Sequence, residues 1–86
     1  MAKYKIEVKP SVWKDLDYVP KLDRRRILRR IQSLSDDPRP VGSQKLTGAE
    51  QYRIRQGVYR IIYEIEDKKL IIVIVKVGHR REVYAR

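Results

Sequence analysis

The sequence predicts an α+β fold in which one strand and two helices precede an antiparallel sheet. Residues 3–9 alternate strictly between apolar and charged side chains, which is typical of a half-buried strand. Between residues 11 and 35 the apolar residues recur at helical spacing, and from residue 51 onward the two-residue alternation returns. The chain of 86 residues is expected to form a single domain, 1–86, because it is too short for a second hydrophobic core.

The N-terminal strand has Tyr4, Ile6 and Val8 on one side and charged residues on the other. Pro10 and Ser11 are expected to end this strand. A serine at this position is also suited to accept a hydrogen bond from the first turn of a helix. Ser11 is therefore expected to cap the helix that follows.

Two helices follow the strand, one on each side of Pro20. In the first, Val12, Leu16 and Val19 lie at positions i, i+4 and i+7 and so share one face. Pro20 is expected to end this helix, because a proline disfavours helical geometry at the residue before it, and to open the next one. So short a link is expected to place the two helices side by side as a hairpin.

The second helix is expected from about residue 21 to about residue 35. Its apolar stripe comprises Ile27, Leu28, Ile31 and Leu34, with Leu22 one turn earlier. Its other face is strongly basic and comprises Lys21, Arg24, Arg25, Arg26, Arg29 and Arg30. Residues 36–43 have the composition of a loop.

The second half of the chain contains three expected strands, with a further short one possible at its end. The strands are expected at 52–55, 58–66 and 70–77, and residues 82–84 are the short last candidate. Gln56-Gly57 is a tight-turn signal between the first two. The segment 70–77 is apolar on both faces, so it is expected to be the central strand, covered on both faces. The helices are expected to cover one face of the sheet and to leave the other open to a partner.

The chain is strongly basic, with 21 Lys and Arg against 11 Asp and Glu and a formal net charge of +10. The charge is spread along the chain, so it belongs to the folded body and is expected to attract a polyanion such as nucleic acid, an acidic protein or an anionic membrane. With no cysteine and one histidine, we expect no disulfide, no thiol nucleophile, no metal site and no cofactor.

We also expect neither a membrane span nor a signal peptide. The longest apolar run has six residues, from Leu70 to Val75. A spanning helix needs about 20. The first residues contain no apolar segment of the kind that secretory signals carry. The cytoplasm is therefore the expected compartment.

Arginine and tyrosine residues are the candidates for function. Arg53 and Arg55 lie two apart on a strand and so project to one face, and Arg60 follows just across the turn. Arg80, Arg81 and Tyr84 follow the expected central strand. Guanidinium groups bind phosphate in a bidentate manner, and a tyrosine ring stacks on a base. Together they suit an RNA strand. His79, the single histidine, is either part of this set or an ordinary surface side chain.

Two segments resemble the RelE toxins of the RelE/ParE superfamily. They are YRIRQGVYRIIY at residues 52–63 and VGHRREVY at residues 77–84. The helix hairpin and the Lys45-Leu46 loop before the strands fit the same family. The resemblance covers nearly the whole chain and implies the small RelE-like, microbial-ribonuclease-type fold. It also implies a toxin of a type II toxin–antitoxin system that cuts mRNA in the ribosomal A site and so inhibits translation.

The resemblance further assigns roles to individual residues. Arg60 would stabilise charge on the scissile phosphate, Arg80 would act as general acid or as a further charge stabiliser, and Tyr84 would stack on the mRNA nucleotide. Arg53 and Arg55 stand where the family typically has lysines that contact the RNA backbone, and Arg81 and His79 are further candidates for RNA binding. Since arginine does not lose its proton, a general-base role at residues 53 and 55 is in doubt.

The expected partners are a cognate antitoxin and the ribosome with its mRNA, with no small-molecule cofactor. Two alternatives remain open at this point. One is a ParE-like inhibitor of DNA gyrase, which would share the fold but lack the catalytic residues. The other is a protein that binds RNA or the ribosome and halts translation without cleavage.

Overall fold

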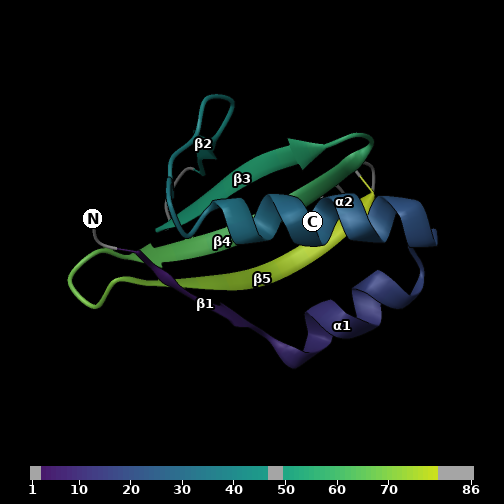
Figure 1. Ribbon diagram of the computed structural model, residues 1–86, viewed down its shortest axis with the longest axis horizontal. Coiled ribbons are helices and arrows are strands. Elements are labelled where there is room, and N and C mark those ends of the chain that lie inside the picture. Colours follow the sequence, from purple (N-terminus) through teal and green to yellow (C-terminus); the bar gives the residue numbers. More distant parts are fainter. Residues whose placement is uncertain (1–2, 47–49, 80–86) are drawn as a thin grey trace.

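The computed structural model describes residues 3–46 and 50–79, and it places two helices against one face of a sheet (Figure 1). In chain order the elements are β1 (Lys5–Val8), α1 (Pro10–Asp17), α2 (Lys21–Ser33), β2 (Gln44–Lys45), β3 (Gln51–Gln56), β4 (Tyr59–Glu66) and β5 (Ile71–His79). The predicted α+β class and the order of strand, two helices and sheet are therefore confirmed. The short strand predicted at 82–84 lies outside the described residues.

The sheet has five strands in the order β1-β5-β4-β3-β2. β3 and β4 pair antiparallel, as do β4 and β5, so the second half of the chain forms a meander as predicted. β1 is the exception, because it lies parallel to β5 along the register Lys5↔Ile71 to Val8↔Ile74. β5 lies inside the sheet between β1 and β4, but the central strand of the five is β4, so the prediction that residues 70–77 form the central strand is wrong. The apolar residues of β5 reflect its two strand neighbours and its packing against α1. The two-residue strand β2 was not predicted.

The helix boundaries differ slightly from those predicted. Pro10, not Ser11, opens α1, and the residue at the N-cap position is Lys9, which makes no side-chain cap. The prediction for Ser11 is wrong because the fixed φ of proline already suits the first helical position. Pro20 caps α2 by accepting the first helical hydrogen bond from the amide of Arg24 at 2.8 Å.

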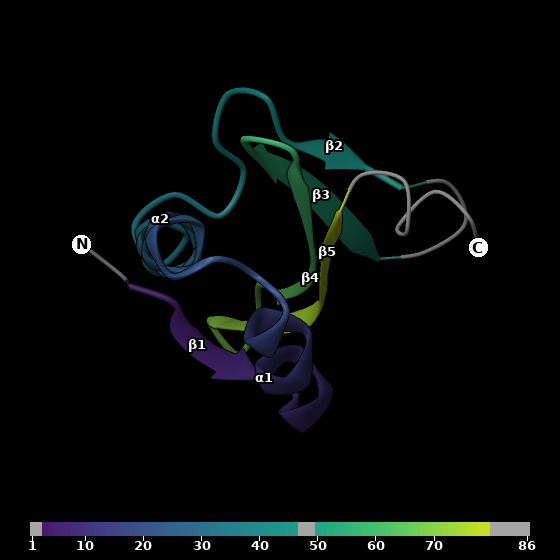
Figure 2. The same cartoon turned by 90° about the vertical axis from the view of Figure 1, so that its right-hand side faces the viewer.

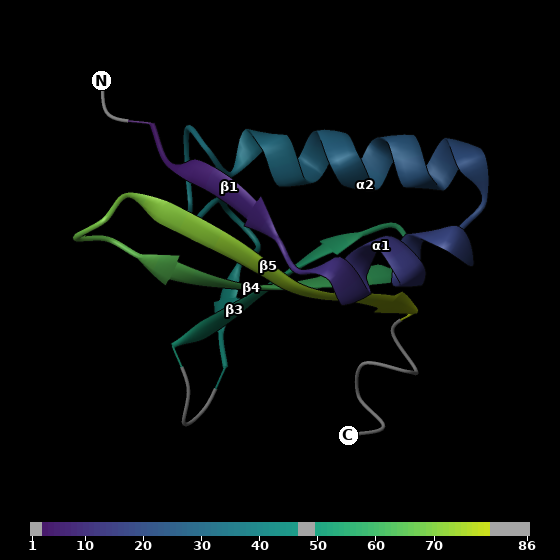
Figure 3. The same cartoon turned by 90° about the horizontal axis from the view of Figure 1, so that it is seen from below.

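The hydrophobic core lies between the helices and the sheet. Both helices lie on the same side of the strands (Figure 3). Figure 2 shows α2 end-on to one side of β4 and β5, and α1 lies near β1 and β5. The fully buried or nearly buried members are Val12, Leu16, Val19, Ile27, Ile31, Leu34, Ile54, Ile61, Tyr63, Ile65, Ile72, Ile74 and Val77. Leu22 was predicted in this set but is 57% exposed, since it lies in the first turn of α2.

Tyrosine rings form part of this packing. Tyr63 is fully buried, and its hydroxyl donates a hydrogen bond to the carbonyl of Pro38 at 2.7 Å. Burial raises the pKa of Tyr63 to about 12, because a phenolate would be poorly solvated there. The ring of Tyr52 stacks on it with the centroids 5.9 Å apart. These two tyrosines therefore pack within the fold.

A turn between β3 and β4 and a bulge within β5 position the residues discussed below. Gly57 opens the turn between β3 and β4 with a φ of +61°, a conformation that glycine adopts without steric cost. In β5, the register to β4 shifts between Ile62 and Tyr63, so that Val75 forms a bulge. The bulge changes which side of the sheet the last residues of β5 face.

Candidate nucleic-acid interface

Three predicted site residues lie on the sheet face that points away from the helices. Ile54 and Ile61 belong to the core, so their neighbours Arg53, Arg55 and Arg60 point to the opposite side by strand alternation. The register places Arg55 directly opposite Arg60 on the neighbouring strand. We call this surface, defined by Arg53, Arg55 and Arg60, the arginine face. These three side chains lie on one face, as predicted, because β3 and β4 pair as a hairpin.

The three arginines differ in their exposure. Arg60 is 5% exposed and Arg53 is 9% exposed, whereas Arg55 is exposed to solvent. Arg53 donates a hydrogen bond from Nη2 to the side-chain oxygen of Gln44, which β2 holds directly opposite it. Of the three guanidinium groups, only that of Arg55 belongs to a residue exposed to solvent. A buried arginine keeps its charge and is held in a fixed orientation by its surroundings.

His79 lies on the other side of the sheet. The register pairs it with Tyr59, and the two rings meet edge to face with their centroids 6.1 Å apart. Tyr59 packs against the hydrophobic core, so His79 points to the helix side and not to the arginine face. The residue opposite Arg60 on β5 is instead Gly78, which has no side chain.

The remaining predicted site residues, Arg80, Arg81 and Tyr84, lie outside the described residues. β5 ends at His79, immediately before them. Their roles stay predictions.

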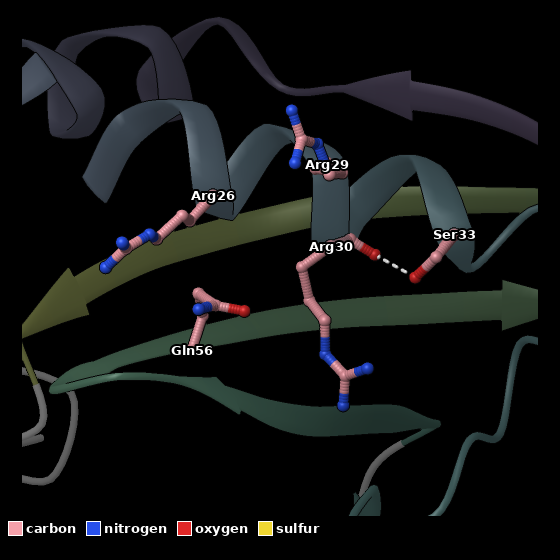
Figure 4. Close-up of a pocket in the computed structure, with 5 residues that line it drawn as sticks. All are labelled: Arg26, Arg29, Arg30, Ser33 and Gln56. Atoms are coloured by element: carbon pink, nitrogen blue, oxygen red, sulfur yellow. Dashed lines mark hydrogen bonds between the residues drawn. The ribbon is translucent and has the colours of Figure 1, made fainter. Parts of the chain in front are cut away.

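A basic groove, which the sequence did not single out, lies between α2 and the end of β3. It has a volume of about 450 Å³ and is lined by Arg26, Arg29, Arg30, Ser33 and Gln56 (Figure 4). We call it the α2 groove. Next to it, a hollow of about 300 Å³ is lined by Arg30, Gly42, Gln44 and Arg55, and we call this the edge hollow. The helical spacing identified the three α2 arginines as one polar face, but only the packing of α2 across the sheet makes them part of a groove.

Within residues 3–46 and 50–79, no three His, Cys, Asp or Glu side chains are grouped so as to hold a metal ion. No helix in the same residues has the length and hydropathy of a membrane span. What the site offers is fixed positive charge together with amide groups, a combination that binds phosphate oxygens.

Comparison with known proteins yields consistent matches. Residues 6–84 match the family described as the ParE toxin of the type II toxin–antitoxin system parDE. The toxin RelG of Mycobacterium tuberculosis is 38% identical over 56 residues, which span 62% of each chain. The putative toxin RelE1 of Methanocaldococcus jannaschii is 29% identical over 95% of this chain and 96% of its own.

Solved structures agree with these sequence matches. The archaeal RelE–RelB complex from Pyrococcus horikoshii OT3 contains a chain that is 33% identical, with a TM-score of 0.82 over 91% of this chain and 96% of that chain. The toxin–antitoxin complex RelBE2 from Mycobacterium tuberculosis contains one that is 26% identical, with a TM-score of 0.83 over 93% of this chain and 94% of that chain.

Proposed function

This chain is a RelE-type toxin of the RelE/ParE superfamily of type II toxin–antitoxin systems, and we propose that it is a ribosome-dependent endoribonuclease that cuts mRNA in the ribosomal A site. The observation that carries the proposal is the arginine face, on which Arg55 and Arg60 lie opposite each other with Arg53 beside them. The exposed guanidinium group of Arg55, with the positive charges of the largely buried Arg53 and Arg60 on the same side of the sheet, suits the phosphates of a single RNA strand.

The proposed reaction is transesterification. The 2′-hydroxyl oxygen of a ribose attacks the adjacent phosphorus, and the bond from phosphorus to the 5′-oxygen breaks. The products are a 2′,3′-cyclic phosphate and a 5′-hydroxyl, and the proton lost by the nucleophile balances the one gained by the leaving group. In this proposal Arg60 stabilises the negative charge that builds up on the phosphate, Arg80 assists as acid or as a second charge, and Tyr84 stacks on the nucleotide.

Acid–base catalysis is expected to be weak at this site. The arginines cannot act as bases at neutral pH, and His79 faces the other side of the sheet beside Tyr59. Most of the rate enhancement must then come from charge stabilisation and from positioning of the RNA. We therefore propose that the ribosome orders the mRNA in the site, and that free RNA is cut poorly.

We further propose that the chain is neutralised by a cognate antitoxin. The support is that two of its structural relatives were solved in complex with a RelB antitoxin, at 33% and 28% identity. A protein with a net charge of +10 is also suited to a partner that carries acidic residues.

The test is to express wild-type protein, Arg60→Ala and Arg55→Ala, and to map the 5′ ends of cellular mRNAs. We expect new ends within translated codons for the wild type and a loss of cleavage of about 10²- to 10³-fold for Arg60→Ala, as for the removal of one transition-state donor. Lys68→Ala is the matched control, because it removes an exposed charge from the β4–β5 turn. Circular dichroism of each purified variant shows whether it is folded.

Two results would contradict the proposal. If a folded Arg60→Ala or Arg55→Ala protein cleaves like wild type, the arginine face is not the site. If wild type stops growth without new 5′ ends, the activity is one of the two alternatives, and a gyrase supercoiling assay distinguishes a ParE-like inhibitor from a non-cleaving ribosome binder. Efficient cutting of naked RNA at the concentration used with ribosomes would refute the requirement for the ribosome.

A further inference from the structure

The basic face of α2 is divided into groups with different surroundings. Arg24 donates a hydrogen bond from Nη2 to the carbonyl of Val19 at 3.2 Å and so takes part in the α1–α2 connection. Arg25 lines a separate hollow of about 300 Å³ together with Lys21 and Leu22. The other three arginines of the helix, Arg26, Arg29 and Arg30, line the α2 groove. Sequence position alone does not distinguish these groups.

The five residues that line the α2 groove are all of polar type. Arg26 and Arg30 extend from the helix toward the strands, with the amide of Gln56 between them (Figure 4). The hydroxyl of Ser33 donates a hydrogen bond to the carbonyl of Arg30 at 2.6 Å, so it stays on the helix. None of the five lining side chains is apolar. A groove of this kind offers positive charge and hydrogen-bond donors.

The groove arginines have no acidic counterpart among the residues that the structure describes. The ion pairs among the described residues involve the basic side chains of Lys3, Arg39, Lys45, Lys69 and Lys76. Elsewhere on the molecule, carboxylates therefore offset part of the positive charge, whereas in the groove Arg26, Arg29 and Arg30 do not take part in any of these pairs. Closely spaced cations without counter-charges attract a multivalent anion.

The α2 groove continues toward the arginine face. Arg30 lines both the α2 groove and the edge hollow, where it lies with Gln44 and Arg55. Gln44 in turn accepts a hydrogen bond from Arg53, and Arg55 lies opposite Arg60. Basic side chains thus form a continuous series from α2, around the edge of β3, to the proposed catalytic site.

We propose that the α2 groove binds the phosphodiester backbone of an RNA segment outside the cleaved one, with Arg26, Arg29 and Arg30 each contacting a phosphate. The identity of the ligand as RNA rests on the proposed function. RNA is favoured over an acidic peptide because the groove continues through Arg30 toward the arginine face, and because no apolar residue is among those that line it. The exposed apolar residues of the helical region, such as Trp13 and Tyr18, are not among the groove residues.

The test is the salt dependence of binding to a fluorescein-labelled single-stranded RNA, measured by fluorescence polarisation on cell-free synthesised protein. In the triple variant Arg26→Gln, Arg29→Gln and Arg30→Gln, the slope of log affinity against log salt is expected to become shallower by about 2. Each of the three lost phosphate contacts accounts for about 0.7 of this change. The matched control, Lys9→Gln, Lys14→Gln and Lys68→Gln, removes the same charge from exposed positions and is expected to retain most of the slope. Arg25→Gln is the single-site control within α2.

Three outcomes would overturn the proposal. One is an equal fall of the slope in both triple variants, which would show a general charge effect. Another is an unchanged slope in the groove variant, with folding verified by circular dichroism. The third is competition by a poly-glutamate peptide that matches unlabelled RNA at equal charge, which would assign the groove to an acidic protein. These binding measurements do not depend on cleavage. A failure of the α2 groove proposal can therefore be distinguished from a failure of the endoribonuclease proposal.

Discussion

Arg39 connects segments outside the core that are distant in the sequence. Its guanidinium group binds both carboxylate oxygens of Asp67, at 3.2 and 2.8 Å, and its Nε donates to the hydroxyl of Tyr52 at 3.1 Å. The hydroxyl of Tyr4 donates to the same carboxylate at 2.7 Å. The loop before β2, the β4–β5 turn and the N-terminal segment are thereby joined. The cluster is exposed to solvent, so salt screens it and its contribution to stability is modest.

The Asp67 carboxylate predicts a specific dependence of stability on pH. Hydrogen bonds from Arg39 and then Tyr4 lower the pKa of Asp67 from 3.8 to about 2. Because the folded state favours the charged form, the stabilisation is complete above the unfolded pKa and is lost as the pH falls toward 2. Asp67→Asn should therefore lower the urea midpoint at pH 6 and flatten its decline between pH 5 and 2. Asp17→Asn, which alters an exposed residue of α1, is the control; an unchanged acid profile in Asp67→Asn would contradict this account.

Among the elements, α1 supports the strand that precedes the proposed catalytic residue Arg80. β1 pairs with β5 only as far as Ile74, and α1 packs against β5 beyond that point (Figure 3). Asp15 accepts hydrogen bonds from the backbone amide of Val77 and from Nζ of Lys76, each at 3.2 Å. A side chain of the helix thus takes the place of the missing strand neighbour at the edge of β5. The bulged end of the strand is held to the body of the molecule by this contact.

Substitution of Asp15 should loosen the end of β5. Asp15→Ala leaves the amide of Val77 without its partner, at a cost of about 1.5–3 kcal/mol for a hydrogen bond to a charged group. Asp15→Asn keeps an oxygen acceptor but loses the charge, so it should cost less. Urea unfolding gives the stability, and hydrogen exchange of the Val77 amide reports the local effect. Asp17→Ala, on the same helix, is the control, and equal exchange in all three variants would show that Asp15 does not hold the strand.

At the scale of the whole molecule, basic side chains outnumber acidic ones by ten. A net charge of +10 is carried by a body with principal extents of 34 × 28 × 25 Å. The arginine face and the α2 groove lie on different sides of β3 and meet at its edge through Arg55. This distribution fits a protein that contacts nucleic acid over an extended surface. The same charges repel one another when no partner is bound.

The free protein should therefore become more stable as salt is added. At 0.1 M salt the screening length is about 10 Å, which is shorter than the dimensions of the molecule, so repulsion between distant charges is reduced. We expect the Tm to rise between low and moderate NaCl concentrations. The rise should be smaller in the triple variant Arg26→Gln, Arg29→Gln and Arg30→Gln, which carries less excess charge. A Tm that falls with salt would mean that ion pairs such as Arg39–Asp67 outweigh the repulsion.

Much of the fold was accessible from local periodicity. The alternation of residues 3–9 and 58–66, the helical spacing of Ile27 and Ile31 and the turn at Gly57 depend on neighbours within a few residues, and each was predicted. For the same reason the sequence predicted that Arg53 and Arg55 share a face. The position of His79 was not predictable in this way, because the bulge at Val75 shifts the register of β5 against β4.

Contacts between distant segments were decided by the tertiary structure alone. The parallel pairing of β1 with β5, the hydrogen bond from Val77 to Asp15 and the burial of Arg60 join residues that no local pattern relates. The α2 groove belongs to the same class, since it exists only where the helix crosses the end of β3. Backbone periodicity is set by sterics and hydrogen bonds between near neighbours, whereas a groove depends on how whole elements pack, and one periodic pattern is compatible with several packings.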